Sequence, residues 1–138
     1  MNNKSIGVFD SGLGGLTAVK SICELMPNEN IVYFGDTGRI PYGTKSAQTI
    51  KRYSEGDINF LLSHDVKLVV IACGTASSVA LADMRGRFSV PIVGVVGAAC
   101  AAAAAACKNG KIGVIGTATT IKSGSYEAGI HKINGDIG

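Results

Sequence analysis

Residues 66–78, VKLVVIACGTASS, constrain the fold of this chain more than any other stretch. Six consecutive apolar residues, 68–73, several of them β-branched, are typical of a strand buried on both faces. Gly74 and Thr75 predict a turn, and apolar residues at helical spacing from Ala76 onward predict a helix. Cys73 is therefore expected at the point where a buried strand ends and a helix begins.

A thiol at that point has two interpretations. Ligands in open α/β sheets bind beyond the carboxyl ends of the strands, and the first N–H groups of a helix are unpaired and partly positive. The strand end places Cys73 where a ligand would bind, and the helix start stabilises a thiolate, so Cys73 is a candidate catalytic base or nucleophile. The alternative is that Cys73 is a small buried hydrophobic residue, as most free cysteines are.

The rest of the chain repeats the same strand–turn–helix pattern. Apolar runs predict four further strands, at residues 5–9, 30–34, 90–96 and 111–115. Helical spacing after each strand predicts helices over 16–26, 47–62, 76–88, 97–107 and 121–133. Five such units predict an α/β fold with a parallel sheet, right-handed crossovers and helices on both faces.

Composition excludes several classes of function. The net charge of +3 is spread along the chain without a dense Lys/Arg run, so nucleic acid is not an expected partner. Four cysteines without CxxC spacing, beside two histidines, argue against a metal site. The apolar run 90–107 is broken by Pro91 and glycines, so it predicts a strand and a helix, not a membrane span. The start of the chain does not resemble a signal peptide, and we expect a cytoplasmic protein with reduced thiols.

Small polar residues gather where three of the predicted strands meet their helices. These residues are Asp10 and Ser11, Cys73 and Thr75, and Thr117 and Thr120. The turn after the first strand has glycines at 12, 14 and 15, which is not the dinucleotide fingerprint, and Asp10 would repel phosphate but pair with an ammonium group. Backbone amides and hydroxyls suit a carboxylate, and a thiol suits proton transfer. Together they predict an amino-acid substrate, with neither cofactor nor metal.

Two of these positions have simpler explanations. Asp10 could be an ordinary turn or helix-capping aspartate. Tyr42 follows Pro41 in a shaped loop and could either line a pocket or pack on the core. A cysteine hydrolase is a weaker reading, because the nucleophile elbow needs glycines where this chain has Ile71 and Thr75.

Five phrases of the sequence resemble the aspartate/glutamate racemase family, and its glutamate racemases in particular. They are FDSGLGGLT, YFGDTGRIPYG, VIACGTAS, VPIVGVV and GVIGTATTIKS, in that order along nearly the whole chain. The resemblance implies cofactor-independent interconversion of L- and D-glutamate, which supplies D-glutamate for bacterial peptidoglycan. It also implies two cysteines, one on each face of the α-carbon, that remove and return the α-proton.

The resemblance assigns roles to residues of this chain. Cys73 matches the first catalytic cysteine, and Asp10 is a substrate contact that also assists Cys73. The remaining matches are substrate-binding positions: Ser11, Tyr42, Gly43, Gly74, Thr75 and Thr117. Gly74 stands where the family has asparagine, so a side-chain amide for the substrate is missing. Cys100 and Cys107 lie in a helical pattern and are predicted to be packing residues.

The resemblance covers about half the family's length. It implies a first racemase domain over 1–96, without its return segment, and the beginning of a second domain over 97–138. Two functions stay open: a glutamate racemase, or a racemase-derived fragment that folds and at most binds a small carboxylate. A homodimer is one assembly that the resemblance allows, and glutamate is the expected partner molecule.

Overall fold

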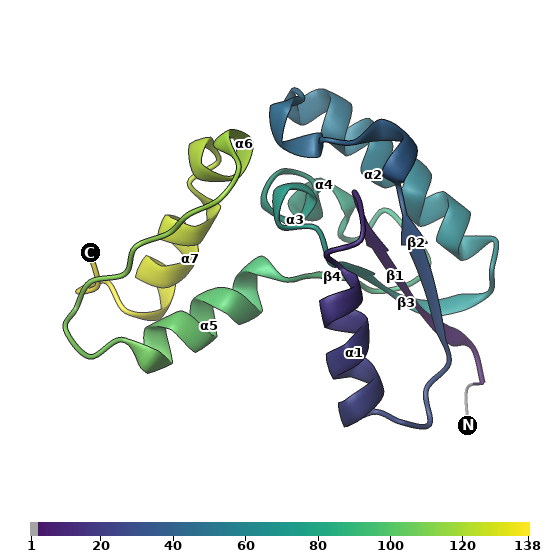
Figure 1. Cartoon of the computed structure of the whole chain (residues 1–138), viewed down its shortest axis with the longest axis horizontal. Coiled ribbons are helices and arrows are strands. Elements are labelled where there is room, and N and C mark those ends of the chain that lie inside the picture. Colours follow the sequence, from purple (N-terminus) through teal and green to yellow (C-terminus); the bar gives the residue numbers. More distant parts are fainter. Residues whose placement is uncertain (1–2) are drawn as a thin grey trace.

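The computed structural model describes residues 3–138 and has a larger and a smaller lobe (Figure 1). The larger lobe holds a four-stranded sheet in the order β2-β1-β3-β4, with every neighbouring pair parallel. The strands are β1 (Ser5–Asp10), β2 (Ile31–Gly35), β3 (Val66–Ile71) and β4 (Ile92–Gly94). The predicted parallel α/β fold is confirmed.

Helices cover both faces of this sheet, as the alternating pattern predicts. The first crossover, α1 (Leu16–Leu25), lies on the opposite side of the sheet from α2 (Ala47–Leu62) (Figure 1). This follows from right-handed crossovers, because the chain moves one way from β1 to β2 and the other way from β2 to β3. Two 3₁₀ turns, η1 (Thr37–Arg39) and η2 (Tyr42–Thr44), connect β2 to α2.

The main core lies between the sheet and α2. Helix α2 begins where the Ser46 hydroxyl accepts a hydrogen bond from Thr49 N–H at 3.2 Å, which satisfies one free donor of the first turn. Its buried face repeats at helical spacing and contains Ile50, Ser54, Asp57, Ile58 and Leu61. The apolar members pack on β1 and β3, whose side chains Phe9, Val69 and Ile71 are fully buried. The burial of this face fixes α2, and with it the loop that precedes it.

The smaller lobe contains α5 (Val96–Ala106), α6 (Ala118–Lys122) and α7 (Ser125–Ile133). Its core is a separate small cluster made of Val96, Cys100, Ile130 and Ile137. Helix α5 is almost entirely alanine, and it approaches α7 closely where Gly129 faces Cys100. A division into domains at residues 96 and 97 stays a prediction.

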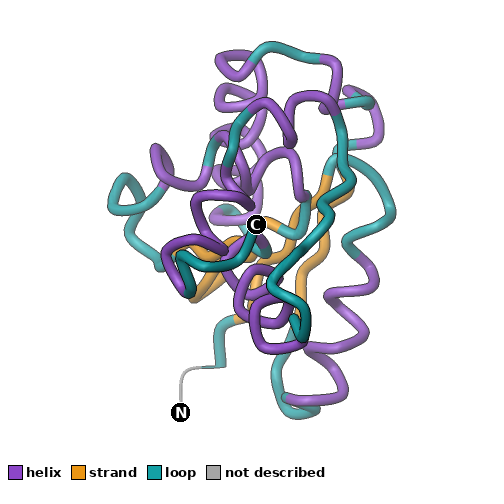
Figure 2. Tube along the Cα trace, turned by 90° about the vertical axis from the view of Figure 1, so that its left-hand side faces the viewer, coloured by secondary structure: helices purple, strands orange, loops and turns teal. Residues whose placement is uncertain are grey.

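The prediction of a strand at 111–115 is wrong, since these residues form an extended loop (Figure 2). Ile112 N–H donates to Gly138 C=O, and Gly138 N–H donates to Gly110 C=O, both at 2.8 Å. Within residues 3–138, no strand lies alongside the rest of the run, and Ile115 is 99% exposed. A strand needs a neighbour for its backbone groups, which periodicity alone cannot supply.

The structure also corrects the boundaries of several predicted elements. Strand β3 ends at Ile71, so Cys73 lies in the turn and caps α3 (Gly74–Val79), which begins two residues earlier than predicted. The predicted helix 76–88 is shorter and is broken at Ala80, after which α4 (Leu81–Met84) follows. The last predicted helix divides at Gly124, whose φ of 66° is left-handed. In the described part of the chain, no helix is both long and apolar enough to cross a membrane.

Candidate active site

The carboxyl ends of β1 and β3 bring Asp10 and Cys73 to one edge of the sheet. Ala72 N–H donates to Phe9 C=O at 2.8 Å, so the two strands stay in contact up to the turn. Beyond it, the Cys73 thiol lies 3.6 Å from Ser11 Oγ, and the Ser11 hydroxyl lies 3.5 Å from Asp10 Oδ1. The three predicted site residues therefore form one polar contact path from carboxylate through hydroxyl to thiol.

The glycine-rich turn folds around the Asp10 carboxylate. Gly15 N–H donates to Asp10 Oδ2 at 2.9 Å, at the start of α1. A Cβ on Gly15 would lie 2.7 Å from Asp10 Cβ and 3.0 Å from Ala72 Cβ, so only glycine allows the turn to come this close. Asp10 is 7% exposed. Its Oδ2 accepts the Gly15 N–H, and its Oδ1 faces the Ser11 hydroxyl.

Cys73 belongs both to this edge and to the hydrophobic core. It is 4% exposed and packs in the main apolar cluster. Its Sγ also accepts a hydrogen bond from Ala76 N–H at 3.4 Å, as the capping side chain of α3. The sulfur is therefore buried but has two polar contacts, one of them to a residue on a different strand-to-helix turn.

Tyr33 is a member of this site that the sequence analysis missed. Its hydroxyl donates to Gly12 C=O at 2.7 Å, which ties β2 to the glycine-rich turn. Burial raises the pKa of Tyr33, and negative charge on Asp10 and Cys73 raises it further. Strand register could have found this residue, because Val8 pairs with Tyr33 and Asp10 with Gly35, which puts Tyr33 on the same sheet face as Asp10.

Three threonine hydroxyls join the two lobes beside this edge. Thr75 Oγ1 and Thr117 Oγ1 are 2.9 Å apart, Thr117 Oγ1 and Thr120 Oγ1 are also 2.9 Å apart, and Thr120 Oγ1 lies 3.3 Å from Thr75 Oγ1. Thr117 additionally caps α6 by accepting from Thr120 N–H at 3.2 Å. The structure thus brings together Thr75, Thr117 and Thr120, three of the small polar residues that the sequence places at the strand-to-helix turns.

Gly43 lies directly against α6. A Cβ on Gly43 would be 2.5 Å from Thr117 Cβ, and the Thr119 hydroxyl donates to Gly43 C=O at 2.8 Å. The neighbouring Tyr42 side chain is 1% exposed and belongs to the main core cluster. Of the two readings of Tyr42, packing on the core describes its side chain.

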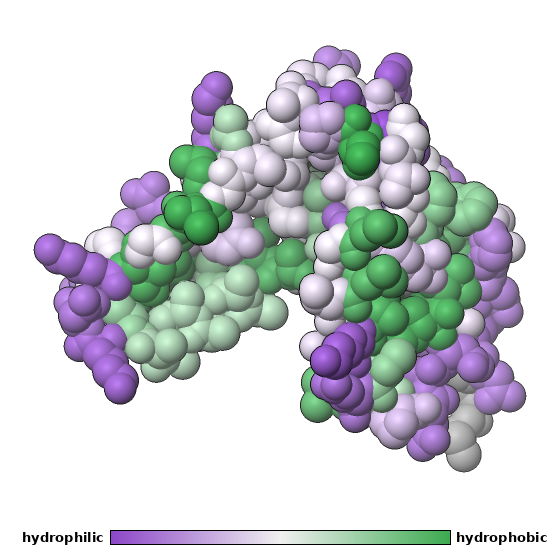
Figure 3. Space-filling view, in the orientation of Figure 1, coloured by the Kyte–Doolittle hydropathy of each residue, from purple (hydrophilic) through white to green (hydrophobic). Residues whose placement is uncertain are grey.

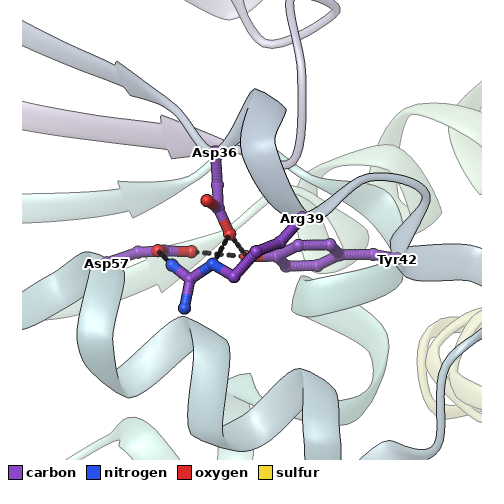
Figure 4. A network of polar contacts seen from close by, with 4 residues as sticks. All are labelled: Asp36, Arg39, Tyr42 and Asp57. Atoms are coloured by element: carbon purple, nitrogen blue, oxygen red, sulfur yellow. Dashed lines mark hydrogen bonds and ion pairs between the residues drawn. The ribbon is translucent and has the colours of Figure 1, made fainter.

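The Tyr42 side chain ends in a buried network with Asp36, Arg39 and Asp57 (Figure 4). Its hydroxyl is hydrogen-bonded to Asp36 and, at 2.8 Å, to Asp57 Oδ2. Arg39 forms ion pairs at 2.7 Å with both carboxylates, through Nε to Asp36 and through Nη2 to Asp57. Burial raises the pKa of Asp57 to about 6, against the lowering effect of the Tyr42 hydrogen bond. Burial likewise raises the pKa of Tyr42, and its bonds to the two acids raise it further.

Gly74 leaves open space at the start of α3. A Cβ built there meets only Tyr126 Oη, at 4.0 Å. One groove of about 330 Å³ lies on the smaller lobe, where Ile112, Val114 and Ile130 are among its lining residues. A second groove, of about 490 Å³, lies where Gly43 meets Thr119. Figure 3 shows hydrophobic surface on both lobes around the recess between them. Among the described residues, no group of three or more His, Cys, Asp or Glu side chains is arranged to hold a metal ion.

The other buried cysteine is far less polar in its surroundings. Cys100 faces Tyr126 C=O at 3.6 Å inside the smaller lobe, and burial raises its pKa. Cys107 lies 3.6 Å from Lys111 C=O on the same lobe. Cys100 is a member of the small apolar cluster, as predicted, whereas Cys107 lies just past the end of α5 and is only partly buried against that cluster.

Comparison with known proteins decides the family. The family model described as Asp/Glu/Hydantoin racemase matches residues 15–137. The chain belongs to this racemase family. It is 48% identical over 134 residues to a glutamate racemase of Geobacter metallireducens, covering 97% of this chain and 50% of the relative. It is 46% identical over 132 residues to a glutamate racemase of Aquifex aeolicus, covering 96% and 52%. The chain therefore spans about half the length of the curated racemases it matches.

Solved racemase structures share this fold. A glutamate racemase isoform from Bacillus anthracis aligns with a TM-score of 0.93 at 39% identity, covering 98% of this chain and 51% of that one. The glutamate racemase of Francisella tularensis, solved in complex with D-glutamate, aligns with a TM-score of 0.89 at 42% identity, covering 99% and 51%. The sequence resemblance to this isomerase family is confirmed, together with its fold.

Proposed function

We propose that this chain forms one face of a glutamate racemase site, in which Cys73 exchanges the α-proton of glutamate without a cofactor. The observation that carries the proposal is the contact path from Asp10 through Ser11 to the Cys73 thiol at the carboxyl edge of the sheet. A thiol next to a carboxylate can lose its proton to an acceptor and regain it during each turnover. The solved relative that binds D-glutamate supports the choice of substrate.

Each proposed contact follows from the charge of the substrate. The ammonium group of glutamate suits the Asp10 carboxylate, and its carboxylates suit the hydroxyls and free backbone amides near Ser11, Thr75 and Thr117. The backbone at Tyr42 and Gly43, and the start of α3 at Gly74, complete the proposed binding surface. The missing asparagine amide at Gly74 would weaken binding by about 1 to 3 kcal/mol.

The proposed proton transfers balance with two acid–base groups. The Cys73 thiolate takes the α-proton and becomes a thiol, while the electron pair stays on the carbon and spreads into the α-carboxylate. A second acid then protonates the carbon from the opposite face. The contacts of Cys100 and Cys107 within the smaller lobe do not suit that role. By the family resemblance, the second acid belongs to the half of the relatives that this chain does not match.

The complete activity would supply D-glutamate for peptidoglycan in the cytoplasm, and a homodimer is the assembly that the family suggests. The alternative function is a fold that binds a small carboxylate without turnover. The open space beside Gly74, where the family carries an asparagine, favours that alternative.

Exchange in deuterated water separates the two functions. We expect L-glutamate incubated with the chain to gain deuterium at the α-carbon, which ¹H NMR measures. Its optical rotation should not change, because the proposed site has a single acid–base group, Cys73. Cys73→Ala should abolish the exchange, and Cys23→Ala, at an exposed position, serves as the matched control. Exchange retained in Cys73→Ala would refute the site, and binding without any exchange would establish the alternative. Loss of optical rotation would refute the single-base assignment.

A further inference from the structure

The buried network around Tyr42 has no part in the proposed proton transfer, and its composition is unusual. Two carboxylates and one guanidinium carry a net charge of −1, and Asp57 is completely buried while Asp36 is 6% exposed. Buried ionised groups are costly unless they are paired. Both acids are paired here with one guanidinium, that of Arg39, whose side chain is 38% exposed, so one negative charge of the cluster stays unbalanced.

The hydrogen bonds at Tyr42 are also too numerous for one proton. The phenol has a single O–H, so it can donate one full hydrogen bond, to Asp36 or to Asp57. A proton on one of the carboxyls, donated to the phenol oxygen, would satisfy the second close contact. Arg39 already donates to both acids, so one added proton makes the cluster neutral. The bonding geometry itself therefore favours a shared proton.

The network is connected to the proposed substrate site through the backbone. Gly43 follows Tyr42 directly, its C=O accepts from the Thr119 hydroxyl, and its Cα faces Thr117. Thr117 in turn contacts Thr75, two residues after Cys73. The segment 42–43 is thus bonded to α2 through Asp57 and to α6 through Thr119.

We infer that Asp57 is a positioning residue: through Tyr42 it fixes the Gly43 backbone against α6, and a change in its protonation shifts that contact. The part that concerns glutamate rests on the proposed function, whereas the link from Asp57 to Gly43 does not. The charged and titratable groups that face Asp57 in this cluster are Asp36 and Arg39 from the β2–α2 connection and Tyr42 from η2. Tyr53 on α2 packs against Tyr42 and Arg39, and the exposed Arg52 lies over the Tyr53 ring. The raised pKa of Asp57, about 6, sets the range in which the shift is expected.

Amide NMR on the whole chain tests the link. In the wild type we expect the Gly43 and Thr119 amide signals to titrate together with a midpoint near pH 6, because burial raises the pKa of Asp57 to about 6. In Asp57→Asn both amides should be displaced and should lose this titration. Glu55→Gln is the matched control, because Glu55 lies on the same helix but pairs with Arg87 at the exposed surface. Tyr42→Phe, which keeps the ring, should displace the same two amides and covers the case in which Asp57→Asn does not fold.

The glutamate part is measured on the same samples. Binding of L-glutamate is detected as a shift of the Ser11 and Cys73 amides. If the chain binds it, Asp57→Asn should weaken the affinity about fivefold, which corresponds to the net contribution of one hydrogen bond. Gly43 and Thr119 amides that stay unmoved in both variants would overturn the inference. A wild type in which Ser11 and Cys73 do not respond to L-glutamate would instead refute the proposed function, and the Gly43 result would stand on its own.

Discussion

Replacing Asp57 by asparagine should change how the stability of this protein depends on pH. The folded Asp57 carboxyl has its pKa raised to about 6 from an ordinary 3.8, chiefly because the side chain is buried. The stability that this group contributes is therefore fully present below pH 3.8 and is lost as pH rises through about 6. Asparagine has no such titration, so the variant should lack this part of the pH dependence.

The structure gives the size of the effect. Asp57 is 0% exposed, so solvent screening does not reduce it. The difference between about 6 and 3.8 corresponds to about 3 kcal/mol. Since the unfolded carboxyl is already partly ionised at pH 4, the wild type should lose roughly 2 kcal/mol relative to Asp57→Asn between pH 4 and pH 7.

Urea denaturation followed by circular dichroism at several pH values measures this difference. The quantity compared is the free energy of unfolding of the wild type minus that of the variant, so that the other carboxyl groups cancel. Glu55→Gln should leave the wild-type dependence unchanged, because its ion pair with Arg87 is exposed. A wild type that gains stability over Asp57→Asn as pH rises would refute the reasoning, since the Arg39 ion pair would then outweigh the cost of burial.

Two further predictions concern close contacts at glycines, and both are checked by the free energy of unfolding in urea. Gly43→Ala should cost about 1 to 3 kcal/mol, because the new Cβ would lie 2.5 Å from Thr117 Cβ. The control Gly38→Ala, with open space around it, should cost less than about 1 kcal/mol. Equal effects of the two substitutions would contradict the close approach of the loop to α6. Gly129→Ala should cost a similar amount, because its Cβ would lie 2.7 Å from Cys100 Sγ, whereas Gly97→Ala, in an open position of α5, should raise stability by up to about 1 kcal/mol. A stabilising Gly129→Ala would show that α5 and α7 do not pack as described.

The sequence alone predicted the edge at which the site residues gather. Asp10 and Cys73 both follow apolar β-rich runs, and the carboxyl ends of parallel strands meet at one edge of a sheet. What periodicity did not reveal was that β1 and β3 are direct neighbours, which makes the contact through Ser11 possible. The parallel register, read residue by residue, also explains why Tyr33 was missed: its role depends on its partner Val8, not on its own run.

The Asp57 network could have been anticipated from the helical pattern. Residues 50, 54, 57, 58 and 61 lie on one face of α2 and all are buried, yet two of them, Ser54 and Asp57, are polar. A carboxylate on a largely apolar helix face predicts a buried partner. Its partners Arg39 and Tyr42 come from the preceding loop, and no helical or strand spacing connects a loop to the helix that follows it.

The wrong strand at 111–115 shows where sequence reasoning reaches its limit. The run KIGVI has a strand's composition, but strand formation depends on a pair of chains, and only the first residues of the run find a partner, at Gly138. Val114 and Ile115 are left 36% and 99% exposed, and Val114 lines the apolar groove of about 330 Å³. Backbone groups of an unpaired extended segment are free to accept a neighbour. The composition of this run thus favours a strand, but among the described residues only Gly138 forms a backbone hydrogen bond with it, at Ile112.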